Sequence, residues 1–211
     1  MILVSGHMSG EGSVESTRRR LTKRQADTVR RLTEAAVDEV RSVGYSGLRV
    51  RNVAARGGVA PATAYTYFSS KNHLVTEVFW RRISMLEPVA DSAGEPVERV
   101  VRTLRELALL VADEPELASA CTVAMLGDDP DVQHLRGRIG HAWQQRLAAA
   151  LGEGHRHAVL RALEMSLAGA MLHAGMGYAS YGRTADHLER TARLIMADPG
   201  GDAAPEETSG P

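Results

Sequence analysis

The segment from Pro61 to Lys71 gathers side chains whose types and spacing could do chemistry by hydrogen bonding. It carries hydroxyls and aromatic rings where an ordinary amphipathic helix would carry a solid apolar face: Thr63, Tyr65, Thr66 and Tyr67. A Gly57-Gly58 break precedes it, and Pro61 suits the first position of a new helix, where its missing N–H needs no partner. Two short helices around a glycine-containing turn predict a helix-turn-helix, whose second helix enters the major groove of DNA.

Histidine spacing does not favour a metal site. His155 and His157 are two apart at an expected helix start, so their side chains diverge by about 200°. His134 and His141 are seven apart, and no cysteine or carboxylate completes a ligand set. Cys121, the single cysteine, has no basic neighbour or resolving cysteine, which argues against a redox sensor. We therefore predict no metal and no cofactor.

Sequence motifs of catalysis are missing as well. No Gly-x-Ser-x-Gly, His-Glu-x-x-His or Walker sequence occurs, and Gly175-x-Gly177 lacks the preceding strand and the third glycine of a dinucleotide loop. We predict that the chain is not an enzyme. The alternative is an all-α enzyme that acts on an apolar or acyl-thioester substrate, and it would leave the helix-turn-helix unexplained.

The composition is that of a globular protein. Of 211 residues, 44% are hydrophobic and 24% are charged. No apolar run approaches the ~18–20 residues that span a bilayer, and the start of the chain lacks the basic flank of a signal peptide. A single cysteine fits a reducing compartment. We expect a cytoplasmic protein with no membrane partner.

Helical periodicity and Pro/Gly punctuation predict an all-α fold of about nine helices. The first covers residues 22–43 and ends at Gly44; the short pair covers 48–56 and the segment from Pro61, and a fourth helix ends near residue 87. Prolines open the next three, at 96–111, 115–126 and 130–151. A long helix over 155–181 and a last one, capped by Thr184 and ending near 197, complete the set.

Charge divides the chain into two unlike parts, although the net charge is only −1. Residues 1–80 hold 12 Arg and Lys against 7 Asp and Glu, whereas residues 81–211 hold 13 against 19. The basic run before the first helix, which includes Arg18, Arg19, Arg20 and Lys23, is either a solvated tail or an arm that contacts phosphates or the minor groove. We expect a disordered arm over 1–21, a DNA-binding domain over 22–70, a ligand-binding and dimerisation domain over 71–198, and a disordered tail over 199–211.

The long helix over 155–181 is apolar on two faces, which predicts burial on two sides. The core of one chain easily covers one face, and a partner subunit would cover the other; a core that absorbs both faces is the alternative. The residues assigned to a homodimer interface come from this helix and the last one: Leu163, Leu167, Ala170, Met171, Ala174, Tyr178, Leu188, Thr191 and Ile195.

The ending Tyr65-x-x-Phe68-x-x-Lys71 resembles the end of the recognition helix in TetR-type transcriptional regulators, and the resemblance covers about residues 24–86. It implies a homodimer that presents two recognition helices to a palindromic operator. A ligand cavity would lie among the middle helices, and the last two helices would form the dimer bundle. The resemblance assigns DNA contacts to Arg51, Pro61, Ala62, Thr63, Tyr65, Thr66, Tyr67 and Lys71, beside the basic arm. Arg49, Ala60 and Ala62 depart from the family pattern, so individual base contacts are not transferred.

The C-terminal half is loosely similar, around Asp113-Glu114-Pro115, to mycobacterial-type regulators of sterol and fatty-acid catabolism, whose effectors are acyl-CoA thioesters. The residues expected to line an effector cavity are Leu104, Leu107, Val111, Cys121, Met125, Trp143, Leu147, Met165, Leu172, His173 and Met176. We therefore predict a homodimeric repressor that a small apolar effector releases from its operator, with the fourth helix as the lever.

Overall fold

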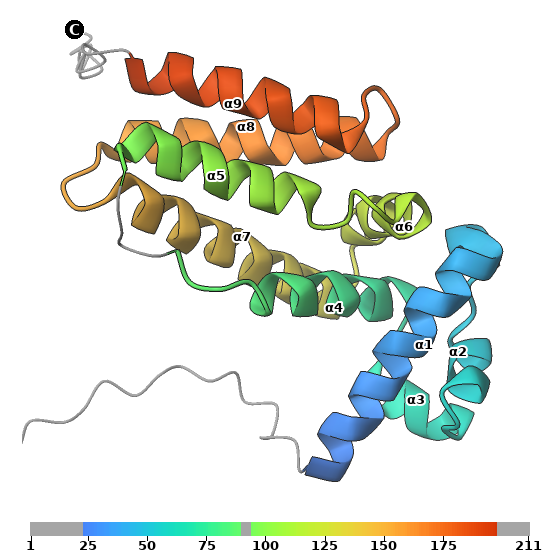
Figure 1. Ribbon diagram of the computed structural model, residues 1–211. Helices are drawn as coiled ribbons and strands as arrows, with labels where there is room; N and C mark the ends of the chain where they lie inside the picture. The colour runs from blue at the N-terminus through green and yellow to red at the C-terminus, as the bar shows by residue number, and fades with distance from the viewer. Residues whose placement is uncertain (1–22, 90–93, 198–211) are drawn as a thin grey trace, which may run out of the picture.

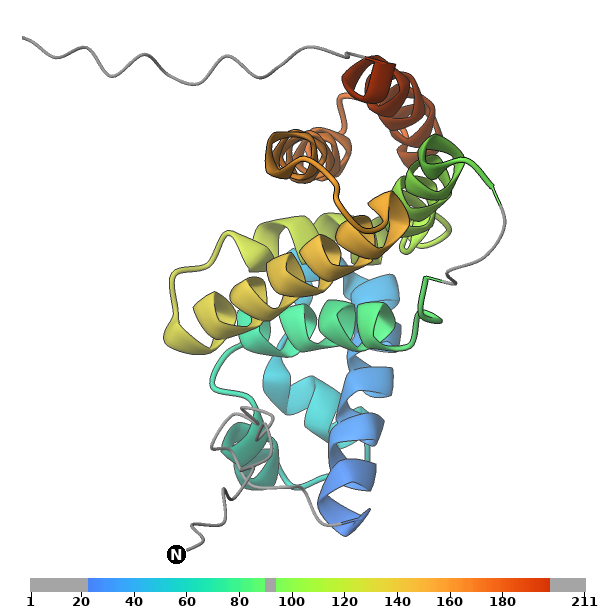
Figure 2. The ribbon, with the colours of Figure 1, turned by 90° about the vertical axis from the view of Figure 1, so that its left-hand side faces the viewer.

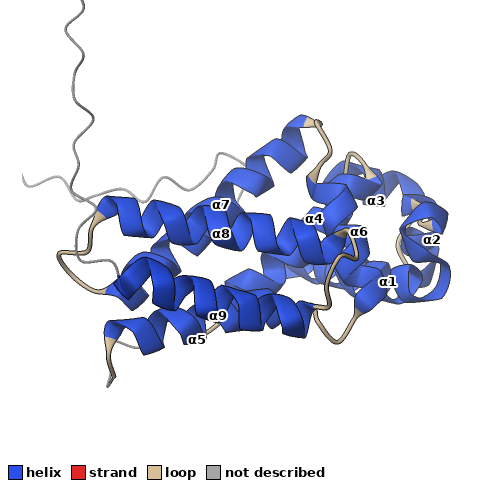
Figure 3. Ribbon diagram, turned by 90° about the horizontal axis from the view of Figure 1, so that it is seen from above, coloured by secondary structure: helices blue, strands red, loops and turns tan. Residues whose placement is uncertain are grey.

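The computed structural model describes residues 23–89 and 94–197, and every regular element within these ranges is a helix (Figure 3). The all-α prediction is confirmed. The helices are α1 (Lys23–Gly47), α2 (Val50–Arg56), α3 (Pro61–Tyr67), α4 (Lys71–Ser84), α5 (Pro96–Leu109), α6 (Pro115–Met125), α7 (Pro130–Leu151), α8 (His157–Gly175) and α9 (Tyr181–Ala197). Arg18, Arg19, Arg20 and the expected tail lie outside the described residues.

Helices α1, α2 and α3 form an N-terminal unit whose apolar core continues into the other helices. Leu32 and Val40 of α1, Val53 of α2 and Phe68, which follows α3 directly, are all buried in it. Gly44 interrupts α1 with φ 66° and ψ 176°, a backbone conformation that glycine adopts readily. The predicted end of the first helix is therefore a kink, after which α1 continues for one more turn.

The punctuation predicted from prolines is present at four helix starts. Helices α3, α5, α6 and α7 all begin with proline. Two side chains cap helices in the expected way, because Ser70 accepts from the His73 amide at 2.9 Å and Asp129 accepts from the Val132 amide at 3.0 Å. Local sequence chemistry thus sets most of the helix starts.

Four predicted boundaries are wrong. Helix α4 ends at Ser84 and not near residue 87, and α2 begins at Val50 and not at 48. The long helix ends at Gly175, because the chain turns at Gly177 with φ 81°. Helix α9 therefore begins at Tyr181, and Thr184, the expected cap, is buried inside it with 3% of its surface exposed.

Helix α4 connects the N-terminal unit with a bundle made of the remaining helices (Figure 1). It contacts α1 on one side and α6 and α7 on the other, while α5, α8 and α9 lie farther from α1–α3 (Figure 2). The helix that follows the recognition helix in sequence therefore joins the two parts covalently, and α1 also packs directly on α6.

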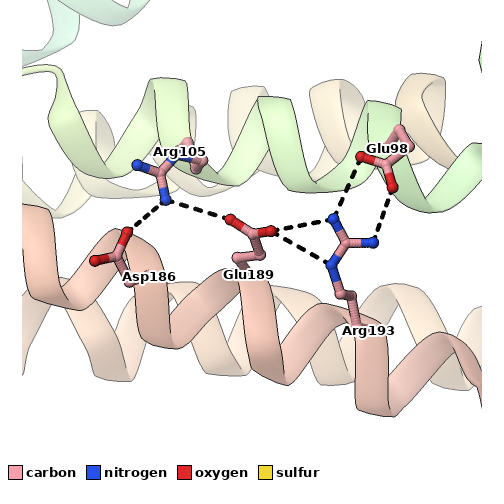
Figure 4. A network of polar contacts seen from close by, with 5 residues as sticks. All are labelled: Glu98, Arg105, Asp186, Glu189 and Arg193. Carbon is pink, nitrogen blue, oxygen red and sulfur yellow. Dashed lines mark hydrogen bonds and ion pairs between the residues drawn. The ribbon is translucent and has the colours of Figure 1, made fainter.

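An ion-pair network joins α5 to α9 at the surface of the bundle (Figure 4). The Arg193 guanidinium donates to Glu98 at 2.8 Å and to Glu189 at 3.1 Å, and Arg105 donates to Asp186 at 2.7 Å. These exposed pairs contribute little to stability, as exposed ion pairs generally do. None of the described helices is long and apolar enough to cross a membrane.

Candidate nucleic-acid interface and effector cavity

The turn between α2 and α3 has the geometry of a helix-turn-helix. Gly58 adopts φ 63°, which favours glycine, and the Arg31 guanidinium of α1 donates to the Gly57 carbonyl at 3.3 Å. Ala64 is fully buried and holds the inner side of α3 against α2. The first helix therefore fixes the turn that aims the recognition helix.

The outer face of α3 is open to solvent. Pro61, Ala62, Thr63 and Tyr65 are exposed, with 53% of the Tyr65 surface accessible, and Arg51 of α2 is exposed too. Two members of the predicted set are engaged with the protein itself. The Thr66 hydroxyl donates to the Ala62 carbonyl at 3.1 Å, and Tyr67 is partly buried against the core.

Lys71 lies against α1 in this structure. Its ammonium donates to the Tyr45 carbonyl at 3.0 Å and lies 4.1 Å from the centre of the Tyr45 ring. The lysine thus holds the last turn of α1, just beyond the Gly44 kink, onto the start of α4. An ammonium group has three N–H donors, and the bond to the Tyr45 carbonyl uses one of them. A phosphate contact by the same group therefore stays a prediction.

A basic hollow lies beside α3. It is lined by residues of α1 and of the turn before α3, including Arg24, Thr28, Arg31, Thr63 and Tyr67. Thr63 and Tyr67 were predicted to contact DNA and Arg24 is part of the predicted basic run, whereas Thr28 and Arg31 were not predicted contacts. The sequence signal was available, because Arg24, Thr28 and Arg31 follow each other at helical spacing on one face of α1. Two guanidinium groups next to a recognition helix suit a DNA phosphate.

An apolar cavity of about 500 Å³ lies among α6, α7 and α8, within the size range of small-molecule sites. Six of the predicted lining residues border it: Val111, Cys121, Met125, Trp143, Met165 and Leu172. Burial raises the pKa of the Cys121 thiol to about 12, so the sulfur behaves as an apolar wall.

Five predicted cavity residues lie elsewhere. Leu104, Leu107 and Leu147 are fully buried in the core, away from the cavity wall. His173 is exposed and stacks on Tyr178 with ring centres 4.7 Å apart, and Met176 is 54% exposed. Helical periodicity marks apolar residues but does not separate a packed core from a wall.

Sequence reasoning also missed part of the lining. The cavity lining also includes aromatic residues of helices from which no lining residue was predicted, among them Phe79 of α4 and Tyr181 of α9. Burial raises the pKa of Tyr181 as well. Polar members are Arg136, Gln144, Arg161 and Glu164, and the Arg161 guanidinium pairs with Glu164 at 3.0 Å. The cavity is therefore apolar inside with charged groups on its lining.

The α8 residues predicted for a dimer interface are mostly buried within a single chain, whereas the other apolar face lines the cavity at Met165 and Leu172 and is also exposed. Leu163 and Leu167 have no exposed surface within a single chain, and Met171, Ala174 and Leu188 are also buried, so these side chains have little surface for a partner. Ala170, Thr191 and Ile195 are partly buried, while Tyr178 is exposed. The exposed apolar stripe is the other face, where Met165, Leu172 and Met176 are 67%, 40% and 54% accessible around Gly169.

No group of three or more His, Cys, Asp or Glu side chains within residues 23–89 and 94–197 is arranged to hold a metal ion.

The chain is similar to known regulators in sequence. Residues 32–78 match the family described as bacterial regulatory proteins, tetR family. The chain is 46% identical over 177 residues to an uncharacterized HTH-type transcriptional regulator of Mycobacterium tuberculosis, which covers 83% of each protein. It is 27% identical over 134 residues to the transcriptional repressor KstR of Mycolicibacterium smegmatis, which covers 62% of this chain and 66% of that one.

Solved structures share the fold. A TetR transcriptional regulator from Rhodococcus sp. RHA1 superposes with a TM-score of 0.69 at 23% identity, over 85% of this chain and 100% of that one. The regulator FadR of Bacillus subtilis, solved in complex with stearoyl-CoA, superposes with a TM-score of 0.51 at 15% identity, over 79% and 96%. At these identities the likeness concerns the fold alone.

Proposed function

Because the chain belongs to the TetR family of bacterial regulatory proteins, we propose that it is a homodimeric repressor that a small apolar effector releases from a palindromic operator. Family membership makes it a DNA-binding transcriptional regulator and not an enzyme. The observation that carries the finer proposal is the cavity among α6, α7 and α8, because α6 packs against α1 and the start of α7 contacts the connection from α3 to α4.

The start of α6 is joined to the N-terminal unit by one carboxylate. Glu114, directly before α6, accepts from the Arg41 guanidinium of α1 at 2.7 Å and from Arg82 of α4. Burial disfavours the charge of Glu114, yet the hydrogen bonds from Arg82 and Arg41 outweigh it and lower the pKa of this carboxyl. A molecule that shifts α6 therefore acts on α1 and on α4, the proposed lever.

A lipid-like molecule fits the cavity best. Its lining is mostly apolar and includes the adaptable side chains Met125 and Met165, while Arg136 and Arg161 are exposed and suit an anionic head group. The relative KstR is a repressor, and the structural neighbour FadR holds stearoyl-CoA. KstR supports repression, and the FadR complex supports an effector of fatty acyl or acyl-CoA type.

The exposed stripe of α8 is the surface proposed for the second subunit. Large apolar side chains alternate there with Ala168 and Gly169, which let a second helix approach closely. A dimer would bring two recognition helices to successive major grooves ~34 Å apart. The coupling between cavity and operator would be worth ~1–3 kcal/mol, the usual range.

The test begins with selection of operator duplexes from a random pool by the full-length protein. We expect a two-fold symmetric site, an affinity that falls steeply with salt, and a dimer on that site in sedimentation. Mass spectrometry of the purified protein identifies any molecule carried in the cavity, and that molecule or stearoyl-CoA should weaken operator binding. Binding without sequence preference, or a monomer on the operator, would contradict the proposal.

A further inference from the structure

The turn that ends the recognition helix is held by the first turn of α7. The Ser69 hydroxyl donates to Asp131 Oδ2 at 2.7 Å, and the Ser70 hydroxyl donates to Asp129 Oδ2 at 3.1 Å. The two serines connect α3 to α4, and the two aspartates lie about 60 residues later in sequence, at the start of α7. Hydrogen bonds to an ionised group are shorter and stronger than neutral ones.

His73 connects this contact with the core of the N-terminal unit. Its Nδ1 lies 3.3 Å from Asp131 Oδ2 and 3.2 Å from the Ser69 hydroxyl. The ring is buried and packs edge to face on Phe68, with centres 5.3 Å apart. Phe68 is the buried residue directly after α3, so the His73 ring connects Asp131 with the end of the recognition helix.

The other part of α7 forms the wall of the cavity. Ile139, Gly140, Trp143 and Gln144 line it, which places them ~12–20 Å along the helix from Asp131 at 1.5 Å per residue. A helix of this length moves as a rod, so a displacement at the cavity reaches its first turn. The same helix therefore contacts the effector site and the end of the recognition helix.

We propose that Asp129 and Asp131 are positioning residues for the recognition helix and transmit effector binding from α7 to α3. The inference rests on the proposed function, because it needs an operator and an effector cavity. It adds a second path to the one through α4. Because coupling is reciprocal, operator binding must also be felt at the first turn of α7.

The experiment measures that reciprocal effect by hydrogen exchange in the full-length protein, with and without a selected operator duplex. We expect the amides of residues 132–135 in the wild type to exchange about fivefold or more slowly at operator saturation, within the usual coupling range. Ser69→Ala and Asp131→Ala should each remove most of this protection. The double variant should lose no more than Asp131→Ala alone, because that substitution already removes the Ser69 contact together with the contact to His73.

Two variants separate coupling from helix stability. Asp129→Ser keeps a side chain that caps α7 but is too short to reach Ser70, so it should reduce the protection while α7 stays folded. Ser84→Ala removes a hydroxyl that bonds only within α4, to the Trp80 carbonyl, and should leave the protection unchanged. Full protection in Ser69→Ala and Asp131→Ala, or none in the operator-bound wild type, overturns the inference. Failure to select any operator overturns the proposed function itself, and with it the inference.

Discussion

Tyr65 and Phe68, three residues apart, have opposite environments. Tyr65 is 53% exposed on the outer face of α3, whereas Phe68 is 2% exposed in the core. We expect Tyr65→Phe to weaken operator binding by about fivefold or more, the loss of a hydrogen bond to a charged phosphate, with no change in Tm. Phe68→Ala should instead cost ~3–5 kcal/mol of folding free energy, which thermal unfolding measures. Equal losses of stability in both variants would contradict this division of roles.

Cys121 should be inert in the folded protein. Its thiol is buried in the cavity wall, and burial raises its pKa to about 12, so almost no thiolate exists between pH 7 and pH 9. We expect iodoacetamide to alkylate Cys121 only at the rate of unfolding, and guanidinium chloride to release the reaction. The measurement is the time course of mass increase. Rapid alkylation of the native protein at pH 7.5 would show that the cavity opens far more often than the structure implies.

Residue chemistry could be predicted from sequence where each side chain acts alone. The local pattern predicts that Thr63 and Tyr65 are exposed and that Phe68 is buried. The single cysteine of the chain likewise leaves Cys121 without a disulfide partner in the same chain. Lys71 could not be placed, because its partner Tyr45 lies 26 residues earlier and reaches it only through the Gly44 kink.

Helix α6 depends on one carboxylate at its start, and this dependence should be visible in pH. The pKa of Glu114 is lowered from 4.5, so its contribution to stability is present above pH 4.5 and is lost as the pH falls through the lower folded value. We expect Glu114→Gln to cost ~2 kcal/mol at pH 7, mainly through the loss of charged hydrogen bonds with Arg82 and Arg41.

The control for this prediction is the acid limb of the same titration. As the pH falls through the lowered folded pKa of Glu114, the wild type and Glu114→Gln should converge in free energy of unfolding, because both then carry a neutral side chain at this position. Urea unfolding at a series of pH values measures the difference. A gap between the two proteins that does not narrow at all as the pH falls below 4.5 would refute the assignment.

Helix starts were predictable and helix faces were not. Proline and capping residues mark the starts of α3, α5, α6 and α7 in the sequence. Both sides of α8 are apolar, so periodicity alone cannot tell the core side from the free side. Side-chain type does not separate the two faces either, since Met171 is buried beside Leu167 while Leu172 is exposed.

At the scale of the whole molecule, the exposed stripe of α8 is the surface proposed for association of two chains. A side chain added at Gly169 would touch nothing within 4 Å in a single chain, so Gly169→Glu should leave the monomer folded. We expect it to abolish the dimer, because a buried unpaired carboxylate is costly at an apolar interface. Sedimentation at several protein concentrations provides the measurement.

Gly137→Glu is the matched control. Gly137 also lies in a long helix, is exposed and has open space around it, but it belongs to α7 and lies outside the stripe. It should remain dimeric and bind the operator like the wild type. A dimer that survives Gly169→Glu would move the interface to another surface.

The contacts at the starts of α6 and α7 also determine how the N-terminal unit can turn. The unit is held at one place by Glu114 and by the packing of α1 on α6. It is held at the other by Asp129 and Asp131, which bind the two serines of the covalent path into α4. A body held at two places keeps one rotation, about the line between them. In the proposed switch, the recognition helix would therefore leave the DNA along an arc about that line and not by general loosening.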